Sequence, residues 1–159
     1  MALRTIRKEN EPCLRKVCRP VEVYDEKLGV LIDDLFDTMY HADGVGLAAP
    51  QVGILRRVAV IDTGEVKLAM VNPEIVERSG NYGAYEGCLS FPEQSGYVER
   101  SEHVRLRYFD RDGNPQECSV DMLAARAAQH EIDHLDGHVF LDLITEPPEG
   151  FDADDAEEE

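Results

Sequence analysis

Two stretches with a helical spacing of apolar residues lie near opposite ends of this chain, and the sequence between them is patterned for strands. Residues 25–43 place leucine, isoleucine, phenylalanine and methionine three and four apart, and Asp25 is a suitable N-cap. Residues 121–137 are rich in helix formers and stop at Gly137, which suits the left-handed position after a helix. Because helices and strands do not alternate, a parallel doubly wound sheet is not expected, and the order predicts an α+β fold.

The strand signals between the two helices are short. Residues 56–62 and 67–72 are apolar runs typical of strands. Residues 103–110 alternate apolar and polar side chains, and a turn at Asp112-Gly113 leads into residues 116–120, which is the pattern of a β-hairpin. The stretch YEGCLSFP, residues 85–92, contains glycine and proline, and we expect it to be irregular.

Length and charge set the broad class. A chain of 159 residues without repeats or linkers is most simply one domain with its own core. The net charge of −17 argues against direct nucleic-acid binding. No apolar run suggests a signal peptide or a membrane span, so a cytoplasmic location is expected. Residues 146–159 are acidic without lysine or arginine, so we expect a solvated, disordered tail after a single domain formed by residues 1–145.

The second helix carries QHEIDH, residues 129–134, in which a glutamate follows the first of two histidines. Residues four apart lie on one helix face with Cβ atoms roughly 6 Å apart, so His130 and His134 could bind one cation together. Glu131 could then reach a water bound beside them without being a ligand itself. The alternative is an ordinary polar helix face that binds no metal.

A catalytic metal site of this kind needs a third protein ligand and an open position. Phe140 stands where the metzincin pattern has a third histidine, and Gly137 should end the helix and turn His138 away. Cys88 is the better candidate because a thiolate suits borderline or soft divalent ions. Taken alone, however, Cys88 fits a buried core cysteine better than a metal ligand.

A glycine-rich stretch, GVGLAAPQVG, covers residues 44–53. Its glycines allow another chain to approach closely, and Gln51 offers a neutral amide donor. The pattern matches neither the phosphate-binding loop nor the dinucleotide-binding loop. A turn without any ligand remains the alternative for this stretch.

The three stretches GVGLAAPQ, EGCLS and QHEIDH, in this order, resemble the three sequence motifs of the peptide deformylases, and the likeness extends over about residues 3–145. It implies an α+β fold in which antiparallel and mixed sheets wrap around a central helix that carries HEIDH. It also implies a hydrolase that removes the formyl group from the N-terminal formylmethionine of new proteins, giving formate and a free amine. A zincin-type metallopeptidase and a non-catalytic metal-binding protein are the alternatives.

By this resemblance, Cys88, His130 and His134 bind one divalent metal ion, and a water fills the fourth position. Ferrous iron is the expected ion in the cell, and zinc, nickel or cobalt can occupy the same site. The sequence does not choose among these metals, because geometry and availability decide as much as affinity does.

The resemblance also assigns catalytic roles. Glu131 is expected to act as general base and then as general acid. The side-chain amide of Gln51 and the backbone N–H of Leu89 are expected to stabilise the negative charge that develops on the formyl oxygen. Glu86 and Gln129 are expected to support these residues from behind.

For the substrate, the backbone of Gly46 is expected to pair with the backbone of the formylated peptide. The side chains expected to form the methionine pocket are those of Val45, Leu123, Arg126 and Ala127. Neighbouring Ala124 and Ala128 either enlarge this pocket or face the core. Formylmethionyl peptides and nascent chains are the expected partners, but the acidic C-terminus cannot dock on the ribosome as the basic C-terminal helix of some bacterial members is thought to do.

Overall fold

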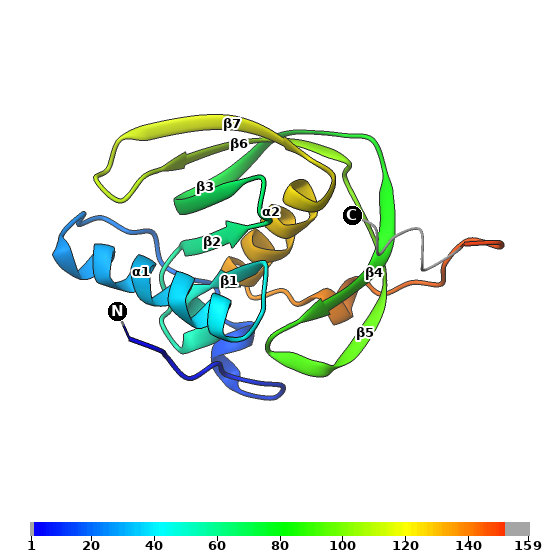
Figure 1. Ribbon diagram of the computed structural model, residues 1–159, viewed down its shortest axis with the longest axis horizontal. Helices are drawn as coiled ribbons and strands as arrows, with labels where there is room; N and C mark the ends of the chain where they lie inside the picture. Colours follow the sequence, from blue (N-terminus) through cyan, green and yellow to red (C-terminus); the bar gives the residue numbers. More distant parts are fainter. Residues whose placement is uncertain (1, 152–159) are drawn as a thin grey trace.

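Within residues 2–151 the chain forms two antiparallel sheets and two α-helices, and the second helix lies between the sheets (Figure 1). The computed structural model describes residues 2–151. Its fold is α+β, as predicted. In chain order the elements, with η marking 3-10 helices, are η1 (Pro12–Arg15), α1 (Glu26–His41), β1 (Gly46–Ala48), η2 (Ala49–Val52), β2 (Val58–Asp62), β3 (Lys67–Ser79), β4 (Tyr82–Cys88), β5 (Phe91–Arg100), β6 (His103–Phe109), β7 (Pro115–Asp121), α2 (Met122–Leu135) and η3 (Phe140–Leu143).

The larger sheet has five strands in the order β1-β2-β3-β6-β7, and every neighbouring pair is antiparallel. Strand β2 is covered on both faces. Val58 and Val60 pack with the apolar face of α1, while Ala59 and Ile61 pack with α2. Because successive side chains of a strand point to opposite faces, a strand between two helices is apolar throughout, which explains the unbroken run VAVI.

Both helices begin and end close to the predicted residues. Asp25 is the N-cap of α1, and its carboxylate accepts a hydrogen bond of 3.1 Å from the backbone N–H of Leu28. Helix α2 ends at Leu135, and Gly137 follows with a φ of 80°. The predicted hairpin is present as β6 and β7, and the turn between them contains Gly113 with a φ of 85°.

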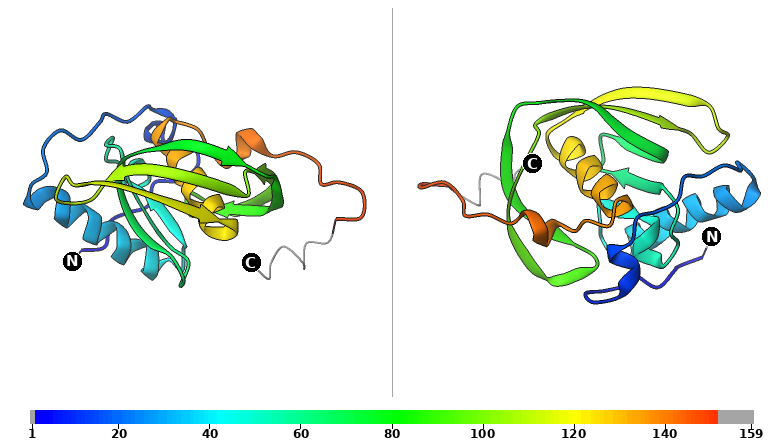
Figure 2. Two further views of the ribbon diagram at one scale, coloured as in Figure 1. Left: turned by 90° about the horizontal axis from the view of Figure 1, so that it is seen from above. Right: turned by 180° about the vertical axis from the view of Figure 1, so that it is seen from behind.

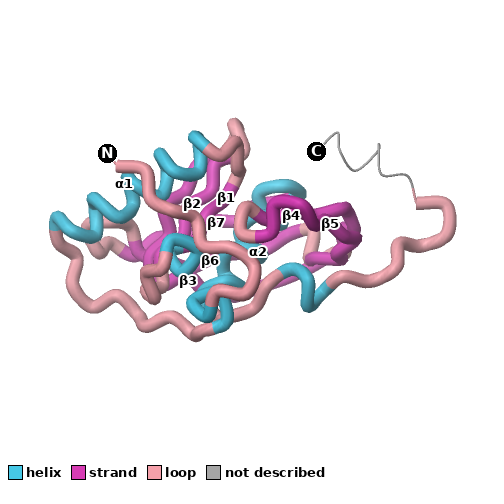
Figure 3. The backbone as a smooth tube through the Cα atoms, turned by 90° about the horizontal axis from the view of Figure 1, so that it is seen from below, coloured by secondary structure: helices cyan, strands magenta, loops and turns pink. Residues whose placement is uncertain are grey.

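The smaller sheet was not predicted. Strands β4 and β5 form a two-stranded antiparallel sheet that lies on the far side of α2 from the larger sheet (Figure 3). The stretch around Cys88, expected to be irregular, instead ends β4, passes through a turn at Leu89 and Ser90, and starts β5 at Phe91. Irregularity is confined to this turn and to a shift in register after Gly87.

Helix α2 lies between the two sheets, as Figure 2 shows from behind. Its alanines explain how close it can lie to the larger sheet, because small side chains let a helix approach its neighbours. Ala124 and Ala128 belong to the core cluster with Met70 and Leu106. These two alanines therefore face the packed core rather than enlarging a pocket, whereas Ala127 borders both the core and the cavity described below.

No helix within residues 2–151 has the length and apolar character needed to cross a membrane. Of the acidic tail predicted to be disordered, residues 152–159 lie outside the described part of the chain. The first six tail residues, 146–151, are described and contain no helix or strand.

Gly137 provides a test of how α2 is joined to the N-terminal part of the chain. A Cβ atom added at Gly137 would lie 2.7 Å from the backbone oxygen of Arg15, and φ is 80°. We expect Gly137→Ala to lower the free energy of unfolding by roughly 2–4 kcal/mol, from backbone strain and a backbone clash together. The matched control is Gly64→Ala, where φ is 93° and a Cβ would meet nothing within 4 Å. Urea denaturation measures both losses, and equal losses would contradict the proposed clash.

Candidate metal centre and cavity

Three potential metal ligands converge where the end of β4 meets α2. The Sγ atom of Cys88 lies 3.3 Å from Nε2 of His134, and this nitrogen lies 3.2 Å from Nε2 of His130. The three donor atoms all lie within 4.8 Å of one another. Tetrahedral coordination with nitrogen about 2.0–2.1 Å and sulfur about 2.3 Å from an ion places neighbouring donors roughly 3.3–3.6 Å apart. The donor set therefore fits a divalent transition metal in both chemistry and spacing.

The rings of the two histidines are oriented for this role. Nδ1 of His130 lies 2.5 Å from the carboxylate of Glu86, which leaves its Nε2 facing Cys88 and His134. Burial and the neighbouring His130 lower the pKa of His134 well below its usual value, so its imidazole is neutral and can donate a lone pair. At His130 burial lowers the pKa, but Glu131, Cys88 and Glu86 outweigh it and raise the pKa well above its usual value. The surroundings of His130 thus favour positive charge at this point.

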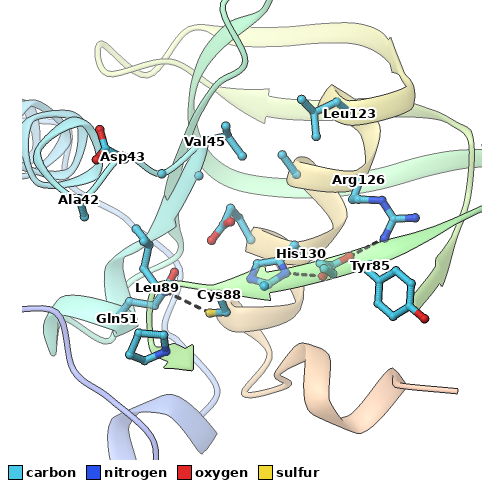
Figure 4. A pocket seen from close by; sticks show the side chains of 17 residues that line it. Ala42, Asp43, Val45, Gln51, Tyr85, Cys88, Leu89, Leu123, Arg126 and His130 are labelled. Atoms are coloured by element: carbon cyan, nitrogen blue, oxygen red, sulfur yellow. Dashed lines mark hydrogen bonds and ion pairs between the residues drawn. The ribbon is translucent and has the colours of Figure 1, made fainter. Parts of the chain in front are cut away.

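Glu86 is a buried carboxylate that links β4 to α2 and β5. Arg100 donates to both of its oxygens over 2.8 and 2.7 Å. Arg126 donates to Oε2 over 2.6 Å (Figure 4). Burial raises the pKa of Glu86, but the hydrogen bonds from Arg100 and His130 outweigh burial and hold the pKa well below its usual range. Glu86 is therefore an ionised carboxylate that orients the ring of His130, an arrangement typical of metal-binding histidines.

Glu131 belongs to α2, and its side chain extends towards β1. Its carboxylate packs so closely against Gly46 that any Cβ atom there would overlap with Oε2. Burial raises the pKa of Glu131 to about 7, although the nearby His130 opposes the shift. Its Oε1 is buried and has no hydrogen-bond partner among residues 2–151. A carboxyl group with a pKa near neutrality can both accept and return a proton.

The amide of Gln51 is held in one orientation. Its Oε1 accepts a hydrogen bond of 2.9 Å from the backbone N–H of Ala48. The NH₂ group must therefore face the other way, where it lies 3.1 Å from Oγ of Ser90 and 3.6 Å from Sγ of Cys88. A fixed donor thus points towards the metal ligands from the 3-10 helix that follows β1, and Leu89 directly follows Cys88 in the turn opposite.

These groups lie at the bottom of a cavity of about 550 Å³ (Figure 4). The structure brings the residues predicted for metal binding, catalysis and substrate binding together there, and of these His134 alone lies beneath the cavity, fully buried. The predicted residues that line the cavity are Val45, Gly46, Gln51, Glu86, Cys88, Leu89, Leu123, Arg126, Ala127, His130 and Glu131.

Three details of the cavity were not apparent from the sequence. Asp43, Tyr85 and Pro92 also line it, and only their position next to the motifs could have indicated this. Arg126 was expected to contribute its apolar stem, but its guanidinium is also buried and binds Glu86. Gln129, expected to be a supporting residue, has its amide hydrogen-bonded to the backbone N–H and carbonyl of Ser101 and does not face the cavity.

Two sheet edges border the cavity. Among the described strands, β1 pairs with β2 alone and β4 pairs with β5 alone. The cavity lies between Val45 and Gly46 on the β1 side and Tyr85, Gly87 and Cys88 on the β4 side. An unpaired edge offers backbone donors and acceptors to an extended peptide. The cavity therefore suits a peptide in extended conformation.

The role of Glu86 can be tested by metal binding alone. We expect Glu86→Gln to weaken the binding of Co²⁺, measured by its visible absorption, by roughly 10–100-fold, because His130 loses the carboxylate that orients it. The control is Asp133→Asn, since Asp133 contacts Arg100 at 2.9 Å but not His130. Thermal unfolding of the metal-free variants separates loss of folding from loss of affinity. Equal Co²⁺ affinity in Glu86→Gln and the unaltered chain would contradict this role.

Comparisons with known proteins agree with the geometry. Residues 3–149 match the sequence model of the polypeptide deformylase family. The chain is 51% identical over 144 residues to the peptide deformylase of Agathobacter rectalis, covering 91% of each chain. It is 51% identical over 146 residues to peptide deformylase 1 of Clostridium acetobutylicum, covering 92% of this chain and 97% of that one.

A solved structure extends the likeness to three dimensions. The crystal structure of peptide deformylase from Thermotoga maritima superposes with a TM-score of 0.89 at 44% identity, covering 92% of this chain and all (100%) of that chain. A match of this extent in both sequence and structure leaves one assignment, that the chain belongs to the polypeptide deformylase family and is a metallohydrolase.

Proposed function

We propose that this chain removes the formyl group from N-terminal formylmethionine of new proteins, using Cys88, His130 and His134 to hold the metal ion and Glu131 to transfer protons. The observation that carries the proposal is the convergence of these three donor atoms beside Glu131 and Gln51, at the bottom of a cavity between two open sheet edges. The wider assignment to peptide deformylases rests on the family match.

One divalent ion would be held by Cys88, His130 and His134, whose donor atoms are already grouped. When bound, such an ion supplies Lewis acidity that polarises a carbonyl oxygen and makes water a better nucleophile at neutral pH. Ferrous iron is the ion that the resemblance to the family favours, with zinc, nickel or cobalt as substitutes. A thiolate ligand to ferrous iron would make the activity sensitive to oxygen.

The protein's own groups account for the remaining chemistry. The oxygen of water adds to the formyl carbon while Glu131 accepts the water proton, and the C–N bond then breaks as Glu131 returns that proton to the leaving nitrogen. The products are formate and a free amino terminus. The amide of Gln51, fixed by Ala48, and the backbone N–H of Leu89 would donate to the oxygen on which negative charge develops. The burial of Glu131, which raises its pKa to about 7, supports its double role.

The substrate would lie as an added strand between β1 and β4, with its backbone against Gly46. Any side chain at position 46 would overlap with Glu131, so a glycine is required for both groups to stay in place. The methionine side chain would enter the cavity between Val45, Leu123 and Ala127, with the stem of Arg126 beside them. Most of this lining is apolar, which suits a thioether side chain.

The partners are formylmethionyl peptides and nascent chains. Residues 146–159 carry acidic but no basic side chains, so this stretch does not provide the positive charge that would attract it to the ribosome. The net charge of −17 opposes direct nucleic-acid binding. A cytoplasmic location remains a prediction from the sequence.

A zincin-type metallopeptidase has less support. The third ligand of the related metzincin pattern would stand at Phe140, but this residue is buried with its ring against Phe91, at a centroid distance of 6.2 Å. His138 lines a different cavity, beside Asp133 and Asp142. A non-catalytic metal-binding protein would not need Glu131 and Gln51 directed at the metal ligands.

The direct test is formate release from a formyl-Met-Ala peptide by protein prepared without oxygen and loaded with Fe²⁺. Rapid release establishes the activity. If protein that holds one metal ion per chain releases no formate, the proposed substrate is wrong even though the site is intact.

Replacing the proposed general base gives a sharper result. We expect Glu131→Gln to lower kcat by about 10²–10⁴-fold, because the carboxylate that accepts the water proton is lost and that of Glu86 is bound by Arg100, Arg126 and His130. Metal content, measured on the same preparations, should stay at the level of the unaltered chain because Glu131 is not one of the ligands. Asp136→Asn, on the same helix end but with its carboxylate bound to Arg57, is the matched control and should keep full activity. A kcat within threefold of the unaltered chain in Glu131→Gln would exclude the proposed role.

Gln51 can be tested through its partner as well as directly. We expect Gln51→Leu to lower kcat by about 10²–10³-fold, the usual effect of losing one donor to a developing oxyanion. Ser90→Ala should lower kcat by a smaller factor, since the amide keeps its hydrogen bond from Ala48 and loses only the contact at 3.1 Å. Steady-state kinetics with saturating formyl-Met-Ala peptide measures both. If Ser90→Ala proves as inactive as Gln51→Leu, Ser90 does more than hold the amide in place.

A further inference from the structure

The C-terminal segment after η3 runs past the two-stranded sheet, close to β5 (Figure 2). The backbone N–H of Thr145 donates to the carbonyl of Tyr97 over 2.9 Å. Ile144 packs against Gly96, where any Cβ atom would overlap with its side chain. The segment then turns at Pro148, whose carbonyl accepts a hydrogen bond of 3.0 Å from Phe151. Residues 144–151 are thus attached to β5 at one end and turn back towards the sheet at the other.

Phe151 completes a cluster of three aromatic rings on the outer side of this sheet, which is the face of Tyr85 and Tyr97, opposite to that of Glu86. Its ring lies edge-on to Tyr97, with centroids 4.8 Å apart, and 5.8 Å from Tyr85. Tyr85 and Tyr97 face each other across β4 and β5, with centroids 6.1 Å apart. The ring of Tyr97 also covers Gly83, where a side chain would overlap with its hydroxyl. Such edge-to-face contacts add attraction beyond simple burial.

The cluster matters because a two-stranded sheet is barely stable without support. The inner side of this sheet is held by Glu86, which binds Arg100 and Arg126. No helix within residues 2–151 packs on the outer side, and Phe151 covers part of it. Tyr85 belongs to both regions, since it touches Phe151 and also lines the cavity that holds the proposed active site. A shift of Tyr85 would therefore change one wall of the cavity.

We infer that Phe151 is a positioning residue, which holds the Tyr85 wall of the substrate cavity in place through the outer aromatic cluster. Phe151 lies beyond residues 3–149, the part that matches the family. The inference rests on the proposed function, since it concerns the binding of the same formylated peptide. The C-terminal end then has two parts, residues 144–151, which contact the small sheet, and the acidic residues that follow.

The geometry predicts a selective effect on substrate binding. Phe151 contacts no proposed metal ligand and neither Glu131 nor Gln51, so the chemical step should not depend on it. Phe151→Ala should raise KM for a formyl-Met-Ala-Ser peptide by roughly three- to tenfold, the factor expected when aromatic contacts that order a binding wall are lost. Its kcat should stay within twofold of the unaltered chain. A contribution to folding alone would instead lower the apparent kcat with the fraction of folded protein and leave KM unchanged.

Two further variants make the test specific. Phe151→Tyr keeps a ring and should restore the KM of the unaltered chain. A chain that ends at Asp152 loses Asp154, Asp155 and the final glutamates but keeps Phe151, and it should also bind substrate normally. If this shortened chain instead shows the raised KM, the acidic residues rather than Phe151 act on the cavity, and the inference is wrong.

A spectroscopic reading does not depend on turnover. The chain contains no tryptophan, so Phe151→Trp introduces a single indole beside Tyr85 and Tyr97. Titration of the metal-loaded variant with the product peptide Met-Ala-Ser should change its emission in a saturable manner. An unchanged KM in Phe151→Ala together with silent emission overturns the inference while formate release by the unaltered chain still stands. Absence of formate release in the unaltered chain overturns the proposed function. The titration then still shows whether a peptide in the cavity changes the surroundings of residue 151.

Discussion

The buried carboxylate of Glu86 is the interaction on which the rest of the site depends. It comes from β4, and it is bound by Arg100 from β5 and by Arg126 and His130 from α2. Burying a charge without partners is strongly unfavourable, so the four side chains keep one another in place. Removing Glu86 would leave two buried guanidinium groups without the carboxylate that they share, and would remove the contact that joins the small sheet to the central helix.

The position of β4 against α2 decides whether the three metal ligands come together. Cys88 reaches the two histidines only because β4 runs across α2 at the level of their turn. The larger sheet fixes the other side, since β1 brings the backbone of Gly46 against Glu131. The site is therefore formed between two sheets that do not share a strand, and both sheets pack against the central helix α2.

Much of this could be predicted from the sequence for physical reasons. Helix boundaries followed from Asp25 and Gly137, because caps act locally. The β6–β7 hairpin followed from alternation and an Asp-Gly turn. The smaller sheet was missed because its two strands contain three glycines and Pro92, and because the register shifts after Gly87. Its stability comes from α2 and the C-terminal segment, which are distant in sequence.

The sequence by itself determined which chemical groups are present and which of them are close along the chain. The spacing of His130 and His134 placed both on one face of a helix, and the motif around Cys88 marked it as their partner. Only the tertiary structure decided the distances from Sγ to the imidazoles, the orientation of the Gln51 amide, the ion pairs of Arg126 and the contact of Phe151 with Tyr85. The physical reason is that local patterns report the backbone conformation, whereas these contacts join segments whose meeting depends on how the whole core packs.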